Sequence, residues 1–168
     1  MSRGRIAAAI VLLLLTAATV AFIFLNSAEL PEVSNAKSDK VIEIIEEKLP
    51  ELKEAAVNAA GGGEAVFSKL VRKSAHFIEF FILGCELAGL SLLVFSRPFG
   101  RLSEPAFFAL LIAVTDEYIQ GFFGRTDSVD DVILDFVGSL FGILLVSLIT
   151  LTVRFFAAKA KNAGNKTY

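Results

Sequence analysis

Cysteine and charged residues are scarce in this chain of 168 residues. The single cysteine, Cys85, lies in an apolar run, which excludes an internal disulfide and a cysteine-rich zinc site. Charged residues make up 20% of the chain and hydrophobic residues 55%, whereas soluble proteins average about 25% and about 45–50%. One small core cannot bury this apolar excess. The composition therefore predicts a protein whose main partner is the lipid bilayer.

The balance of charge excludes a further class of partner. The formal net charge is −2, and the Lys and Arg residues stand in short clusters. A nucleic-acid-binding protein needs a basic surface that this chain does not offer. We therefore expect no nucleic-acid partner, and the sequence leaves the oligomeric state open.

Four stretches approach the roughly 20 apolar residues that a membrane-crossing helix needs. They cover residues 6–25, 74–95, 105–123 and 132–153. The first is uncharged and follows Arg3 and Arg5, so we interpret it as an uncleaved signal anchor rather than a cleaved signal peptide. The second and third contain charged residues. The sequence thus predicts an all-α, multi-pass membrane bundle of four transmembrane helices.

Basic residues near the ends of these spans predict the orientation of the chain. With four crossings, most of them share one face: Arg3, Arg5, Arg97, Arg101, Arg154, Lys159, Lys161 and Lys166. That face is expected to be cytoplasmic, with both termini inside the cell and residues 154–168 as a cytoplasmic tail. Lys69, Arg72 and Lys73 on the opposite side argue mildly against this orientation.

Residues 26–70 form the extracytoplasmic segment in this topology. We expect a loop over residues 26–38 and then an amphipathic helix over residues 41–58, which Pro50 kinks or splits. Gly61, Gly62 and Gly63 end this helix. Its simplest interpretation is an interfacial helix on the outer leaflet, and a lid or a partner-binding helix is the alternative.

Seven polar residues fall at one depth near the outer ends of the last three spans: His76, Glu79, Asp116, Glu117, Gln120, Asp131 and Asp135. Within each span, spacings of three or four place pairs of them on one helix face. Charged groups inside a span cost about 2.5–3.5 kcal/mol each on insertion scales, so they normally face a wet cavity or a protein interior. We therefore expect a polar cavity open to the outside, with Arg125 at its mouth.

In an alternative interpretation, the polar cluster has only a structural role. Ion pairs between its basic and acidic residues would then hold the helices in register. The pairs would be Arg72 or Lys73 with Glu79 or Asp135, and Arg125 with Asp116 or Asp131. Five carboxylates and one imidazole exceed what three basic side chains need, and buried ion pairs stabilise proteins poorly. We therefore favour a functional site, with His76 beside Glu79 as a candidate general base or proton shuttle. One histidine with carboxylates is an unspecific metal pattern, and we expect no metal or cofactor.

Two further features concern the interior of the spans. Gly138 and Gly142 form a small-xxx-small pair that permits close helix approach, although plain apolar packing explains them equally well. Glu86 lies deeper in the membrane than the other carboxylates. We interpret Glu86 as protonated, and pairing through water or a role in a proton path are the alternatives.

Three motifs follow one another along the chain. They read Arg72-Lys73-x-x-His76-Phe77-x-Glu79-Phe80-x-x-Leu83-Gly84, then Asp116-Glu117-x-x-Gln120 with Gly124-Arg125, then Asp131-Val132-x-x-Asp135-x-x-Gly138-x-x-x-Gly142. In these motifs the chain resembles the VanZ-like family of bacterial membrane proteins. The resemblance covers about residues 70–145 and implies a VanZ-like domain over residues 70–153 with three transmembrane helices. Family members commonly carry Tyr at the position of Phe80 and often Asn at that of Asp135.

The resemblance also implies which residues bind a ligand. Ten motif positions carry over: Arg72, Lys73, His76, Glu79, Asp116, Glu117, Gln120, Arg125, Asp131 and Asp135. The family's namesake belongs to a glycopeptide-resistance cluster and is linked to teicoplanin resistance, without a settled reaction. The first functional hypothesis is therefore a protein that binds an amphiphile at the outer leaflet, either a lipoglycopeptide or a lipid-linked cell-wall precursor.

Two other classes of function stay open. An intramembrane hydrolase or transferase would use His76 as base, Glu79 as its orienter, Asp116 or Glu117 as acid and Arg125 as a clamp. No side-chain nucleophile stands on the right helix face, so water would have to attack. Proton-coupled transport, which depends mainly on Glu86, is the least favoured class.

Overall fold

The computed structural model describes residues 2–59, 63–94, 100–125 and 128–164. These residues form six α-helices and no strand: α1 (Arg3–Ser27), α2 (Pro31–Lys48), α3 (Pro50–Ala59), α4 (Glu64–Val94), α5 (Gly100–Phe122) and α6 (Val129–Gly164). The prediction of an all-α protein is therefore confirmed for the described residues.

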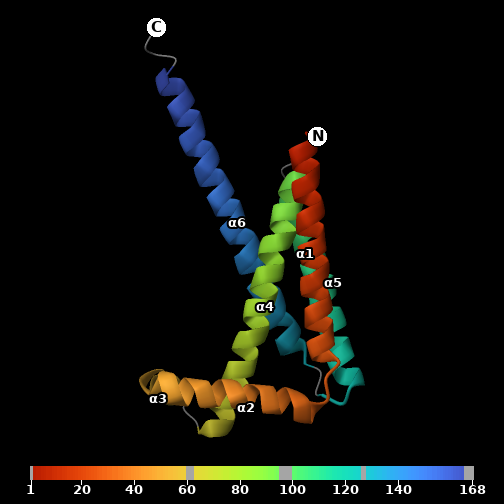
Figure 1. Ribbon diagram of the computed structural model, residues 1–168, viewed down its shortest axis with the longest axis vertical. Helices are drawn as coiled ribbons and strands as arrows, with labels where there is room; N and C mark the ends of the chain where they lie inside the picture. The colour runs from red at the N-terminus through yellow and green to blue at the C-terminus, as the bar shows by residue number, and fades with distance from the viewer. Residues whose placement is uncertain (1, 60–62, 95–99, 126–127, 165–168) are drawn as a thin grey trace.

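The helices divide into a long bundle and a pair that lies across its end (Figure 1). α1, α4, α5 and α6 form the bundle, whereas α2 and α3 lie across the end where α1 stops and α4 begins. The N-terminus and the C-terminal part of α6 lie at the opposite end. The amphipathic segment thus caps one end of the bundle.

Three described helices are long and apolar enough to cross a membrane: Arg3–Ser27, Ala65–Val94 and Val129–Asn162. Their outward faces carry large apolar side chains, with Leu14 66% exposed and Leu148 63% exposed. A surface of this kind suits contact with lipid tails rather than water. The chain is therefore a membrane protein. α5 does not belong to this group of three, because Asp116 and Glu117 cut short the apolar run that follows Pro105.

The contact between α4 and α6 is a direct approach of one backbone to the other. A Cβ atom added at Gly142 would stand 2.2 Å from the carbonyl oxygen of Phe81, and one added at Gly84 would stand 2.1 Å from that of Ser139. A Cβ atom at Gly138 would lie 2.7 Å from the carbonyl oxygen of Phe77. No larger residue fits without separating the helices, so of the two interpretations left open for Gly138 and Gly142, close helix approach is the one that the structure supports.

The apolar core lies between α1, α4 and α5. Its buried members are Ile23, Phe80, Leu83, Leu87, Ala109 and Ala113. The small side chains of α5 let that helix pack closely against the larger residues of α1 and α4. This core lies directly below the polar residues described in the next subsection, because Asp116 follows Ala113 by about one helical turn.

Several helices begin or end beyond the predicted boundaries. The loop expected over residues 26–38 was wrong except at residues 28–30, since α1 continues to Ser27 and α2 begins at Pro31 with proline in its first turn, where its missing N–H costs nothing. α4 begins at Glu64 instead of residue 74, and α6 continues to Gly164. Hydropathy marks only the lipid-embedded part of a helix, so it misses polar turns that extend beyond the bilayer.

Other expectations for the connecting segments had mixed outcomes. Pro50 does split the amphipathic segment, because α2 ends at Lys48 and α3 begins at Pro50. Gly61, Gly62, Arg97 and Lys166 lie outside the described residues. The side chain of Arg101 also lies outside the described part of the chain.

We predict that Gly142→Val lowers the free energy of unfolding by about 1–3 kcal/mol or more, because the Cβ atom of the valine would overlap the α4 backbone. The apparent melting temperature in detergent measures this change. Gly89→Ala is the matched control in α4, since its Cβ would meet the flexible end of Leu12 at 3.3 Å. Equal melting temperatures for both variants would contradict the proposed role of the close contact.

Candidate functional site

Polar side chains gather inside the bundle near the end that α2 and α3 cap. Asp116 is fully buried, and Asp135, Glu117 and Gln120 are no more than 6% exposed. They come from α5 and α6, and Asp116 and Asp135 lie close to the half-buried His76 of α4. The three helices therefore do bring their polar residues together at one depth, as the sequence predicted.

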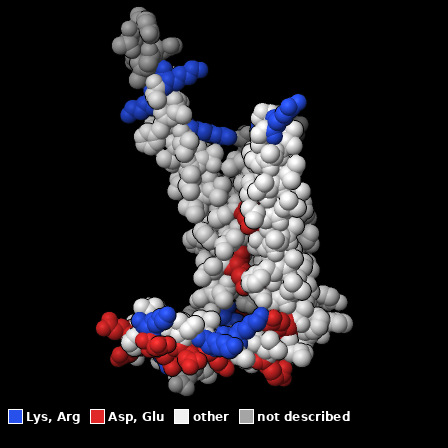
Figure 2. All heavy atoms as spheres, viewed as in Figure 1, with Lys and Arg blue, Asp and Glu red and all other residues white. Residues whose placement is uncertain are grey.

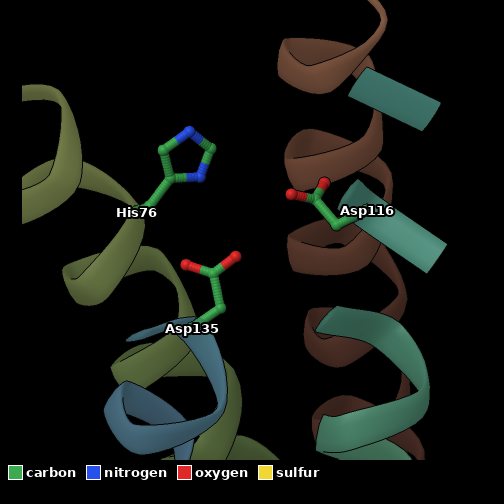
Figure 3. Close-up of side chains that lie close together, drawn as sticks. All are labelled: His76, Asp116 and Asp135. Atoms are coloured by element: carbon green, nitrogen blue, oxygen red, sulfur yellow. The ribbon is translucent and has the colours of Figure 1, made fainter. Parts of the chain in front are cut away.

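The centre of this gathering is formed by His76, Asp116 and Asp135, which we call the triad. One ligand-capable atom from each of the three lies within 4.8 Å of the others. Figure 3 shows a ring nitrogen of His76 facing the two carboxylates. Three residues from three different helices thus converge on one point.

Asp116 is held by hydrogen bonds from two helices. The Ser27 hydroxyl donates to Oδ1 at 2.5 Å, and the Gln120 side-chain amide donates to Oδ2 at 2.8 Å. Ser27 is the last residue of α1 and is fully buried. Sequence reasoning missed Ser27, because a serine at the end of an apolar span carries no signal of its own.

Glu79 lies beside the triad on α4. Its Oε2 stands 4.0 Å from Nδ1 of His76, and its Oε1 accepts a hydrogen bond from Asn26 of α1 at 3.4 Å. Both Nδ1 of His76 and Oε2 of Glu79 are buried, and neither has a hydrogen-bond partner among the described residues. The predicted pairing of His76 with Glu79 is therefore close but leaves hydrogen-bonding capacity on both side chains.

The start of α6 contributes an ion pair and an unpaired acid. Lys73 pairs with Asp131, whereas the sequence suggested Glu79 or Asp135 as its partner. Oδ1 of Asp135 is buried, and no described residue forms a hydrogen bond with it. The ion pair with Lys73 neutralises Asp131 near the surface. Asp135, one helical turn deeper, keeps an oxygen that can bind a ligand.

Arg125 is positioned by the turn that follows α5. Gly124 has a φ of +82°, which glycine adopts without strain, and the backbone N–H of Arg125 donates to the carbonyl oxygen of Gln120 at 3.1 Å. The backbone N–H of Ser128 donates to Oε1 of Glu117 at 2.6 Å and ties the loop to α5. Partial burial and the neighbouring Arg72 lower the pKa of the Arg125 guanidinium, which still remains charged because arginine titrates far above neutral pH.

A polar cavity of about 510 Å³ opens above the triad. The motif residues that line it are Arg72, Lys73, His76, Gln120, Arg125, Asp131 and Asp135. Asp116 and Glu117 lie behind this wall, buried between the helices. Figure 2 shows acidic and basic side chains together at this end of the molecule, whereas basic side chains mark the opposite end in the same view.

An apolar groove of about 570 Å³ adjoins the polar cavity. Apolar residues of α1, α2, α3 and α4 line most of it, among them Phe22, Val41, Ile45, Leu52, Phe67 and Leu70. Arg72, His76 and Arg125 line both spaces. The two cavities therefore meet at these three side chains, and α2 lies along the groove, which it lines with Val41 and Ile45 and with the polar residues Ser34, Lys37 and Ser38.

Glu86 lies apart from the triad. Its Oε1 accepts a hydrogen bond from Thr19 of α1 at 3.0 Å, and it lines neither cavity. The structure therefore does not bring Glu86 into the site with the other acids.

Comparison with protein families identifies the chain. A family model described as VanZ/LLP1 matches residues 10–150. The chain belongs to the VanZ/LLP1 family. The match includes the triad and the residues that line both cavities, and it confirms the resemblance seen in the motifs. Comparisons with curated proteins and with solved structures gave no match.

We predict that Ser27→Ala destabilises this VanZ-like protein by about 1–3 kcal/mol, because the buried Asp116 loses a donor. Ser147→Ala is the control, since its hydroxyl donates to the Ile143 carbonyl of the same helix, and we expect a change within about 0.5 kcal/mol. Melting temperatures in detergent measure both effects. Equal losses of stability in the two variants would show that the hydrogen bond from Ser27 to Asp116 contributes no more than the hydrogen bond within α6.

Proposed function

We propose that this VanZ-like protein binds an anionic amphiphile of the cell envelope, such as a lipid-linked cell-wall precursor or a lipoglycopeptide. The observation that carries the proposal is the pair of adjoining cavities, one polar and one apolar, that share Arg72, His76 and Arg125. An amphiphile has the same division into a charged head and an apolar tail.

The polar cavity suits a phosphate or carboxylate headgroup. Lys69, Arg72, Lys73 and Arg125 line it, and among them Lys73 alone forms a direct ion pair within the described residues. Guanidinium groups bind phosphate and carboxylate oxygens through paired, charge-assisted hydrogen bonds. Arg72 and Arg125 are therefore the residues that we assign to the headgroup.

The apolar groove suits the lipid tail. Its wall combines the amphipathic helix α2 with Phe22 of α1 and with Phe67 and Leu70 of α4. Burial of each methylene group contributes about 0.8 kcal/mol, so a chain of several carbons binds well in such a groove. In this arrangement α2 covers the tail, as a lid would.

The proposed binding site faces the outside of the cell. We assign four membrane crossings to the chain. α5 is the fourth crossing helix, since it packs in the bundle beside α1 and α4. The two ends of the chain then share one side, where Arg3, Arg5 and Arg154 stand, and the positive-inside rule makes that side cytoplasmic. A site at the opposite end reaches envelope precursors and glycopeptides, which fits a link between the family and glycopeptide resistance.

We predict that Arg125→Ala and Arg72→Ala each weaken binding of a polyprenyl-diphosphate cell-wall precursor about 10- to 100-fold, because each loses a charge-assisted contact of about 1.5–3 kcal/mol. Native mass spectrometry of the purified protein measures the bound fraction, with teicoplanin as a parallel probe. Arg154→Ala removes an exposed arginine near the other end of α6 and serves as the control. Unchanged binding in both cavity variants would refute the proposal.

An intramembrane hydrolase or transferase is the second candidate. It is favoured by the buried Nδ1 of His76, which stands 4.0 Å from Glu79 and lacks a hydrogen-bond partner in the described part of the chain. A histidine of this kind can accept a proton from an attacking water. We predict for this candidate that the bound precursor leaves the protein with an altered mass and that His76→Ala releases it unaltered. Release of unaltered precursor by the parent protein would exclude turnover of that substrate.

A further inference from the structure

We propose that the triad of His76, Asp116 and Asp135 binds a divalent transition-metal cation of the zinc class. This inference goes beyond the amphiphile site and does not depend on it. It stands on two observations: the convergence of three ligand-capable side chains, and a buried oxygen among them that no described residue satisfies.

The geometry of the triad is close to that of a metal centre. One atom from each side chain lies within 4.8 Å of the other two, and the side chains point toward a common centre (Figure 3). Ligands around a tetrahedral zinc ion lie about 3.4 Å apart when the bonds are about 2.1 Å long. Small rotations of the three side chains are therefore enough to close the site.

The unpartnered atoms indicate that a positively charged group belongs at this centre. Asp135 is only 1% exposed, yet its Oδ1 has no hydrogen-bond partner within the described part of the chain. The same holds for the buried Nδ1 of His76. A buried acceptor without a partner costs about 1–3 kcal/mol, and more when it is charged. A cation between them would satisfy both atoms at once.

Asp116 is already oriented for such a role. Ser27 donates to one of its oxygens and Gln120 to the other, and each carboxylate oxygen has a further lone pair for a metal. Metal ligands are typically held by outer hydrogen bonds of this kind, which fix their direction. The same two bonds position Asp116 between α1 and the other two members of the triad.

The donor set favours one class of cation over another. An imidazole nitrogen together with two carboxylates suits zinc and similar transition metals, whereas calcium and magnesium prefer oxygen ligands alone. His76 and Asp135 also line the polar cavity of about 510 Å³, which provides an entry route and room for water. Lys69, Arg72, Lys73 and Arg125 line the same cavity; Asp131 pairs with Lys73, and Asp116, Glu117 and Asp131 lie close enough to Arg125 to offset its charge.

The test is a zinc titration of the full-length protein, purified in detergent and stripped with a chelator. We expect one zinc ion per chain, a higher melting temperature with zinc and a much smaller effect of magnesium. Asp135→Asn is nearly isosteric and should weaken zinc binding at least about tenfold, because loss of a direct ligand costs no less than loss of an outer contact. Asp130→Asn removes an acid from the same cavity outside the triad and should bind zinc like the parent.

Two results would overturn the inference: no saturable zinc binding by the parent protein, or equal binding by the parent and Asp135→Asn. If Asp135→Asn fails to fold, Asp116→Asn and His76→Gln answer the same question, and undiminished binding in either one also overturns it. Arg125→Ala should retain zinc, because Arg125 lies outside the triad. Loss of amphiphile with retention of zinc in that variant keeps the two proposals separate.

Discussion

The backbone contact between α4 and α6 is the constraint on which the site depends. Gly84, Gly138 and Gly142 leave no room for a Cβ atom, so the two helices touch along their peptide groups. The carbonyl oxygen that Gly138 approaches belongs to Phe77, the residue after His76, and Gly138 lies within one turn of Asp135. The close contact therefore sets the separation of His76 and Asp135. In a membrane, where apolar side chains gain little by leaving lipid, such packing contributes much of the helix association.

Burial of acids is the feature that this packing makes possible. Asp116 and Asp135 lie in a bundle whose outer surface is apolar, and charged groups at such a position are unfavourable without partners. Ser27 and Gln120 satisfy Asp116. Oδ1 of Asp135 and Nδ1 of His76 keep their binding capacity with respect to the described residues. The packed helices thus satisfy the carboxylate of Asp116 but leave Oδ1 of Asp135 and Nδ1 of His76 without partners among the described residues. Unsatisfied buried atoms that converge on one point are expected in a binding site rather than in a purely structural network.

Periodicity and hydropathy predicted much of this arrangement. The spacing of His76 and Glu79 on one helix, and of Asp116 and Gln120 on another, is enough to identify the polar faces. Hydropathy was less reliable at helix ends, where it placed a loop over residues that form the start of α2. The contribution of α1 was also missed, because Asn26 and Ser27 reach Glu79 and Asp116 from a distant part of the chain. Only folding brings such residues together.

The sequence by itself determined the all-α class, the membrane environment, the family motifs and the faces on which polar residues lie. These follow from composition and from local periodicity, which act within a few turns of one helix. The tertiary structure decided which acid pairs with Lys73, which side chains form the triad, and that a polar cavity and an apolar groove meet at Arg72, His76 and Arg125. The angle and depth at which helices cross depend on side chains from distant parts of the chain, so no local pattern contains them.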